Sequence, residues 1–290
     1  DGRTVDAIMT RARENAARLL FALAAAVGVA AVLMIVLFLL GSAVPTLREI
    51  GLLRFLFGRI WSPSQGRYGI APMLLASLYT TAGALMIGAP PAVLFAIFLT
   101  YYCPRHLHRV LRGAVELLAG IPSIVYGLFG LTVLAPSLRR LFGGSGKGLL
   151  TASVMLGLMI LPTVVSLSEE ALRAVPRACY DGALALGATR ERSVFSSVLP
   201  AAATGVLSAV ILGMGRAVGE TMAVVMVAGN QAVVPKSLTG GLRTLTANIV
   251  LEMGYAVGLH RRALIACGLV LLSFILLIEL CLSALKRRRL

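Results

Sequence analysis

Long apolar blocks without a single charged side chain constrain this chain more than any other feature. The first runs from Leu19 to Thr46, and a second runs from Tyr68 to Pro104. A bilayer core about 30 Å thick is crossed by about 20 apolar residues in a helix, so each block is long enough to span a membrane. Only 13% of the residues are charged, about half the share expected of a soluble domain. Because backbone polar groups in lipid must bond to one another, we predict an all-α, polytopic membrane protein.

The apolar pattern continues to the carboxyl end and predicts six transmembrane helices. We place them at Leu19–Thr46, Pro72–Leu99, Leu117–Leu138, Gly148–Ser168, Val198–Val227 and Ala263–Leu285. They form one membrane domain over residues 19–285, with a segment 1–18 before it and a basic tail 286–290 after it. The chain begins at Asp1 rather than Met, and we expect its native start to be missing. The prolines in GAPPAV, residues 88–93, are expected to kink the second helix.

The basic residues lie mainly between the apolar blocks, and this decides what the net charge of +15 means. Anionic headgroups are the simpler partner for this pattern, and no aromatic residues alternate with Lys and Arg as a base-stacking surface requires. We therefore expect no nucleic acid partner. The positive-inside rule places both termini in the cytoplasm. The basic residues at the two ends are Arg3, Arg11, Arg13 and Arg18, and the KRRR run at 286–289.

Several kinds of chemistry find no support in the sequence. The four cysteines are scattered without a C-x-x-C spacing and only three histidines accompany them, so we predict neither a disulfide framework nor a metal site. GGSGKGLL, residues 143–150, resembles a phosphate-binding loop. However, Leu141 replaces its first glycine and Gly148 replaces its Ser/Thr, which favours a flexible turn. We predict no catalytic residue and no bound cofactor in this chain.

Two charges inside the fifth predicted span, Arg216 and Glu220, need an explanation. A charge at the bilayer centre costs about 2.5–3.5 kcal/mol on insertion scales. Four residues apart on a helix, the two either neutralise each other or line a polar path together with the hydroxyl of Thr221. Arginine suits a tetrahedral oxyanion, because its planar fork donates two parallel hydrogen bonds and stays charged. A carboxylate beside it suits phosphate, which keeps a P–O–H donor near neutral pH, whereas sulfate has none.

The charged segment before the fifth span has a second unusual pattern. In YDGALALGATRERSVFSSVLPAA, residues 180–203, small side chains allow another protein to approach the backbone, and charges hold the segment at the surface. An ordinary helical connector is the alternative interpretation. The pattern resembles the coupling segment of ATP-binding-cassette (ABC) importer permeases, E-A-A, three residues, G, and then thirteen residues to a proline. The matching or neighbouring positions, within a cytoplasmic coupling segment 169–200, are Asp181, Gly182, Ala183, Gly187, Ala188, Arg190 and Pro200.

Three further motifs make this resemblance more specific. GIPSIVYGLFG at 120–130, GRAVGETMAV at 215–224 and LRTLTANIVLEMGYA at 242–256 resemble the PstC family of permeases from bacterial high-affinity phosphate importers. The resemblance implies the type I importer fold, a multi-pass protein of the bacterial inner membrane, and a role in phosphate passage for Arg216 and Glu220. It also implies partners: a PstA-like permease, two PstB-like ATPases that bind ATP and Mg, and a periplasmic PstS-like phosphate-binding protein. The coupling segment is then expected to dock on an ATPase.

Weaker candidates and rival functions remain at this stage. Arg243 and Thr246 either meet phosphate leaving the binding protein or are solvated loop residues. Arg173 and Arg177, four residues apart, are expected to form a basic rim on one helical face. Glu116 and Glu279 are interpreted as interfacial charges, and His106 and His108 as headgroup contacts. The glycines of the 120–130 motif are expected to pack span three rather than to touch cargo. The alternative functions are a permease for another oxyanion such as sulfate or molybdate, a phosphate-sensing scaffold, and a secondary transporter.

Overall fold

The computed structural model describes the backbone of residues 2–287, and the side chains of residues 14–15, 17–281 and 283–284. The predictions for Asp1, for the arginines at 3, 11 and 13 and for the whole tail 286–290 therefore fall outside the described side chains. The helical elements are α1 (Gly2–Ile50), α2 (Leu52–Phe57), η1 (Pro63–Gln65), α3 (Ala71–Ile97), η2 (Phe98–Tyr102), α4 (Arg105–Gly120), α5 (Ser123–Phe129), η3 (Gly130–Leu134), α6 (Ala135–Phe142), α7 (Leu149–Arg173), α8 (Arg177–Ala185), α9 (Arg190–Ser193), η4 (Val194–Val198), α10 (Leu199–Gly219), α11 (Met222–Val227), α12 (Leu245–Met253) and α13 (Gly258–Arg287). The strands β1 (Trp61–Ser62) and β2 (Arg67–Tyr68) pair as an antiparallel hairpin.

The prediction of an all-α chain with six membrane spans is confirmed for the part of the chain that the structure describes. Six helical segments there are long and apolar enough to cross a bilayer. They are Ala17–Ile50, Ala71–Tyr102, Ser123–Phe142, Leu149–Arg173, Arg190–Gly219 and Gly258–Cys281. The second span continues as helix through both prolines of GAPPAV.

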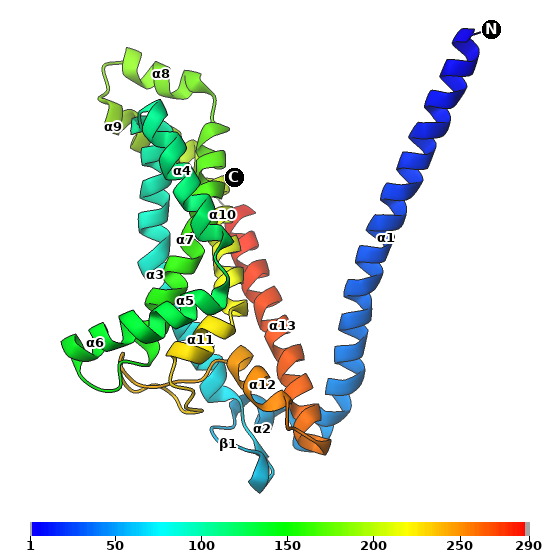
Figure 1. The fold of residues 1–290 in the computed structure, drawn as a ribbon, viewed down its shortest axis with the longest axis vertical. Coiled ribbons are helices and arrows are strands. Elements are labelled where there is room, and N and C mark those ends of the chain that lie inside the picture. The colour runs from blue at the N-terminus through cyan, green and yellow to red at the C-terminus, as the bar shows by residue number, and fades with distance from the viewer. Residues whose placement is uncertain (1, 288–290) are drawn as a thin grey trace.

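The fourth span, α7, lies at the centre of the bundle, with α3 and α10 packed against it (Figure 1). The crossing of α3 and α7 is made by two glycines. A Cβ atom added to Gly88 would lie 2.5 Å from the carbonyl oxygen of Gly157 and 2.9 Å from its Cα. Without side chains the two backbones approach closely, and dispersion contacts replace the hydrophobic effect that lipid cannot supply.

A smaller layer covers one end of the bundle. It is built from α2, the β1–β2 hairpin and α12, which lie where α1 meets α13 (Figure 1). Its core is a separate cluster of buried side chains. The fully buried members include Phe55, Ile70, Met73, Leu245 and Leu264. From this end α1 diverges from the bundle and leaves its apolar residues exposed, as a lipid-facing helix does (Figure 1).

The third predicted span, Leu117–Leu138, is interrupted within GIPSIVYGLFG, as we expected. The structure places the break at the start of this motif, because α4 ends at Gly120, Ile121 is extended and α5 begins at Ser123. The cause is Pro122, which has no N–H to donate and disfavours helical dihedrals in the residue before it. Tyr126 bridges the break, since its hydroxyl donates 2.8 Å to the carbonyl of Leu118.

The opposite end of the bundle carries α8 and α9, which project beyond the other helices (Figure 1). The start of α1 and the end of α13 point toward this same end. The two ends of the described chain therefore share a side with the predicted coupling segment.

Candidate functional site

The fifth span is interrupted at its two most informative residues. The prediction of a continuous helix over Val198–Val227 is wrong, because α10 ends at Gly219 and α11 starts at Met222. Glu220 between them is extended, with φ −68° and ψ 134°. Its Oε1 atom accepts hydrogen bonds from the backbone N–H groups of Thr221 at 3.0 Å and Ala223 at 3.4 Å. This carboxylate thus satisfies donors that the start of a new helix leaves unpaired.

The interruption changes the relation between Arg216 and Glu220. They do not lie four residues apart on one helix, and among the described residues no ion pair joins them. The interpretation of a self-neutralising helical pair is therefore wrong. The Arg216 side chain is exposed on the isolated chain, and its NH1 donates 3.4 Å to the hydroxyl of Thr163 on α7. The other guanidinium donors of Arg216 make no hydrogen bond with the described residues, and are therefore available to a ligand or a partner.

Two threonines hold the interrupted segment in place. The hydroxyl of Thr221 donates 3.1 Å to the carbonyl of Gly219, so it closes the end of α10. The hydroxyl of Thr246 in α12 donates 3.1 Å to the carbonyl of Glu220. Thr246 is buried, so its interpretation as a solvated loop residue is wrong.

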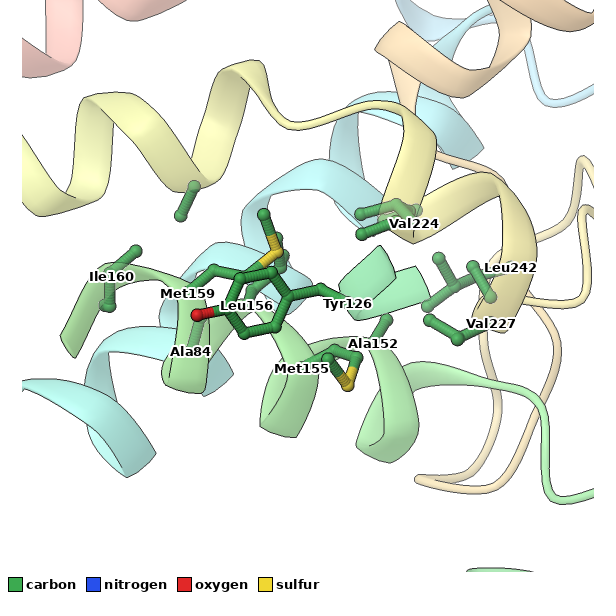
Figure 2. Close-up of a cluster of buried hydrophobic side chains, with 14 residues drawn as sticks. Ala84, Tyr126, Ala152, Met155, Leu156, Met159, Ile160, Val224, Val227 and Leu242 are labelled. Carbon is green, nitrogen blue, oxygen red and sulfur yellow. The ribbon is translucent and has the colours of Figure 1, made fainter. Parts of the chain in front are cut away.

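The α11 side of the break rests on a buried cluster shared with α5 and α7 (Figure 2). Val224 and Val227 of α11 meet Tyr126 of α5 and the methionines Met155 and Met159 of α7 there. The glycine motif of span three makes this approach close. A Cβ added to Gly127 would lie 2.9 Å from the Cα of Ala223, and one added to Gly130 would lie 2.7 Å from Val227. The packing interpretation is confirmed for these two glycines.

Arg243 belongs to a different part of the structure. Its guanidinium forms an ion pair of 2.7 Å with Glu252, and it also donates to Asn248 and to the carbonyl of Asn230. Glu252 accepts two further bonds of 2.8 Å, from the indole of Trp61 and from His260. The side chain of Arg243 is only 19% exposed, so it is not a solvated loop residue. Within the described part of the chain no hydrogen bond or ion pair links Arg243 to Arg216, and its place in a substrate path stays a prediction.

A second buried carboxylate, Glu169, lies at the α8 end of α7, and we did not predict it. It is 1% exposed and binds Arg173 at 2.6 Å, His108 at 2.8 Å and Arg112 at 3.0 Å. The hydrogen bond from Arg112 to Glu116 raises the pKa of the Arg112 guanidinium, and the nearby charge of Glu169 raises it further. The one sequence signal was the spacing of four between Glu169 and Arg173.

This cluster corrects two predictions. His108 binds a buried carboxylate rather than lipid headgroups. Arg173 and Arg177 do not share one helical face, because α7 ends at Arg173 and α8 starts at Arg177 after the Pro176 cap.

The predicted coupling segment is a short helix, a turn and a second helix. In α8, Asp181 and Gly182 are exposed, and a Cβ added to Gly182 would meet nothing within 4 Å. Gly187 in the turn has φ +85°, a left-handed conformation that favours glycine. The hydroxyl of Thr189 then caps α9 by accepting from the N–H of Arg192. The remaining predicted positions are Ala183 near the end of α8, Ala188 in the turn, Arg190 at the start of α9, and Pro200 in the first turn of α10.

The class of protein is indicated by two features together. An exposed helix–turn–helix projects from one end of the bundle, and the fifth span is interrupted. The fold is that of the membrane subunits of ABC importers. One solved neighbour is the MetNI methionine ABC transporter in an inward-facing conformation, with TM-score 0.63 and 21% identity over 80% of this chain and all of that chain. Another is a bacterial ABC transporter involved in the import of the polysaccharide alginate, with TM-score 0.58 and 14% identity over 83% of this chain and 89% of that one. At these identities the likeness shows the fold alone.

Comparison with families makes the assignment more specific. Residues 92–290 match the family described as the binding-protein-dependent transport system inner membrane component, and the chain belongs to this family of transport permeases. It is 38% identical to the phosphate transport system permease protein PstC of Mesorhizobium japonicum, over 77% of this chain and 75% of that protein. It is 40% identical to the probable ABC transporter permease protein YqgH of Bacillus subtilis, over 82% of this chain and 78% of that protein.

Proposed function

We propose that this chain is the PstC-type permease subunit of an ATP-driven phosphate importer and forms half of the path for inorganic phosphate. The observation that carries the cargo assignment is the exposed guanidinium of Arg216 beside the interruption of a membrane span. The relatives named PstC support the same cargo. A charge is retained at this depth because an oxyanion passes beside it.

The geometry of Glu220 supports phosphate over a fully deprotonated oxyanion. Both of its backbone hydrogen bonds fall on Oε1. Oε2 makes no hydrogen bond within the described chain and is free to accept the P–O–H proton of phosphate. Sulfate offers no such proton and would face a carboxylate without a hydrogen bond to compensate the repulsion.

The remaining parts of the importer follow from the surfaces that this chain leaves open. A PstA-like sister permease would close the path on the exposed side of Arg216. The end that carries α8 would lie in the cytoplasm with both termini. There α8 would dock on one of two PstB-like ATPases, which bind ATP and Mg and hydrolyse the nucleotide. A PstS-like protein would deliver phosphate to the opposite end.

The experiment is uptake of radioactive phosphate by proteoliposomes that contain the two permeases and the two ATPases, together with the PstS-like binding protein. We expect Arg216→Gln to reduce uptake by at least about thirtyfold, since losing a charge contact that the passing anion would bury costs about 2–5 kcal/mol. Arg140→Gln on α6, an exposed arginine, is the matched control and should keep normal uptake. Normal uptake by Arg216→Gln would contradict the proposal.

A competition measurement tests the choice of anion. In the parent complex, excess sulfate should not reduce phosphate uptake. Glu220→Gln should reduce the preference for phosphate over sulfate, because an amide no longer repels sulfate. Excess sulfate should then inhibit phosphate uptake by this variant. Sulfate transport by the parent complex would instead favour a permease for another oxyanion.

A further inference from the structure

A polar cavity lies at the α8 end of the molecule, away from Arg216. It has a volume of about 700 Å³ and is enclosed by η2, α4, the end of α7 and the start of α8. The charged side chains that line it are Arg105 and His108 from α4, Arg173 from α7, and Arg177 and Asp181 from α8. The walls therefore come from two segments, residues 99–108 and 172–181, that are distant from each other in sequence.

The charges around this cavity are unbalanced. Arg173 and His108 already bind Glu169, which lies behind the wall. Arg105 and Arg177 form no hydrogen bond or ion pair with any described residue. Asp181 is the one acid on the wall. The cavity thus presents two uncommitted guanidinium groups, one on α4 and one on α8.

Two uncommitted arginines on a cavity wall suit one class of ligand. Each guanidinium donates parallel hydrogen bonds that match the oxygens of a phosphate group. Basic pockets between membrane helices at the cytoplasmic side commonly hold phosphate headgroups. The ring centroids of Tyr101 and Tyr180 lie 5.2 Å apart, and both aromatic residues line the cavity.

We propose that this cavity binds a phosphate-bearing anion, which is either the headgroup of an anionic phospholipid or free inorganic phosphate. The bound group would contact Arg105 and Arg177 together and so tie the start of α8 to α4. Occupancy would then decide how rigidly the docking helix follows the membrane domain. This inference does not depend on the cargo that passes Arg216.

The test uses the complex of permease and ATPase subunits, without the PstS-like phosphate-binding protein and with Arg216→Gln added, which removes both other proposed phosphate sites from the measurement. The lipid arm places the complex in nanodiscs of phosphatidylcholine with increasing phosphatidylglycerol and counts retained phosphatidylglycerol by native mass spectrometry. The phosphate arm measures binding of radioactive phosphate by equilibrium dialysis in nanodiscs of phosphatidylcholine alone.

The variants are Arg105→Gln and Arg177→Gln, singly and combined. Each arginine should contribute about fivefold to affinity, so the double variant should bind its ligand about 25-fold more weakly. Arg105→Lys with Arg177→Lys should retain most of the binding because the charge remains. The matched control is Arg109→Gln with Arg140→Gln, two exposed arginines outside the cavity, and should leave binding unchanged.

The pattern across the two arms identifies the source of the anion. A loss in the lipid arm alone assigns a phospholipid headgroup, and a loss in the phosphate arm alone assigns inorganic phosphate. Parent-like binding of both probes by the double variant overturns the proposal. If the double variant does not assemble, the single variants decide it: an unchanged affinity in both arms for each of them also overturns it.

Discussion

Glu169 of α7 and Arg112 of α4 form an ion pair of 3.0 Å across 57 positions of sequence. The same carboxylate binds Arg173, the last residue of α7 before the turn into α8. One buried acid thus joins α4 to α7 at the turn that leads into α8. We predict that motion of α8 reaches the membrane domain through this junction.

Replacing Glu169 by Gln should destabilise the protein. The change removes the negative charge that Arg112 and Arg173 share, but both arginines are partly exposed and solvent reduces the penalty. We expect a loss of about 2 kcal/mol, below the 3–5 kcal/mol typical of fully buried pairs. Thermal unfolding of the detergent-solubilised complex measures it. Glu116→Gln is the control, because Glu116 is 64% exposed and pairs with the same Arg112. Equal losses from both variants would contradict the junction.

Replacing Gly88 by Ala should separate α3 from α7. The new Cβ would lie 2.5 Å from the carbonyl oxygen of Gly157, which is rigid backbone. Such overpacking costs about 1–3 kcal/mol, visible as a lower unfolding temperature. Gly113→Ala in α4 is the control, because its Cβ would meet nothing within 4 Å. Alanine at position 113 should stabilise the helix slightly. A higher unfolding temperature for the Gly88→Ala protein would contradict the close crossing of α3 and α7.

Replacing Gly187 by Val should uncouple ATP hydrolysis from uptake. Its φ of +85° strains any β-branched residue, although the space around it is open. The strain of about 1–3 kcal/mol would be relieved by reshaping the α8–α9 turn. The measurement is phosphate transported per ATP hydrolysed in proteoliposomes. Gly187→Asn should stay close to normal, since asparagine tolerates left-handed backbone. A normal ratio in the valine variant would show that this turn does not transmit motion.

Replacing Thr246 by Val should weaken uptake without removing a charged group. The variant loses the hydrogen bond to the carbonyl of Glu220, which is worth about 1 kcal/mol. We expect about a fivefold lower uptake rate at low phosphate concentration. Thr246→Ser keeps the hydroxyl and should restore the rate. Thr132→Val, whose hydroxyl donates within its own helix, serves as the control. A serine variant as slow as the valine variant would count against the hydrogen bond.

The apolar blocks and the coupling motif were enough to predict much of this protein. Uncharged blocks longer than about 20 residues have one stable solution in lipid, so the helical class and the six spans followed directly. The spacing from Asp181 through Gly187 to Pro200 is local, and the structure confirms a helix, a turn and a re-entering helix there. Whether this segment docks on an ATPase remains a prediction.

Tertiary contacts decided where the helices stop and what the buried charges do. Val198–Val227 reads as one span, yet Glu220 caps α11 and its carbonyl accepts from Thr246, 26 positions away. Glu169 pairs with Arg112 of α4 and Glu252 with Trp61 of β1, and no local pattern encodes these pairings. A long apolar block in lipid becomes largely helical whatever its neighbours are, because its backbone groups must bond to one another. The partner of a buried charge, however, is set by which helices pack together, and that depends on contacts between residues far apart in the chain.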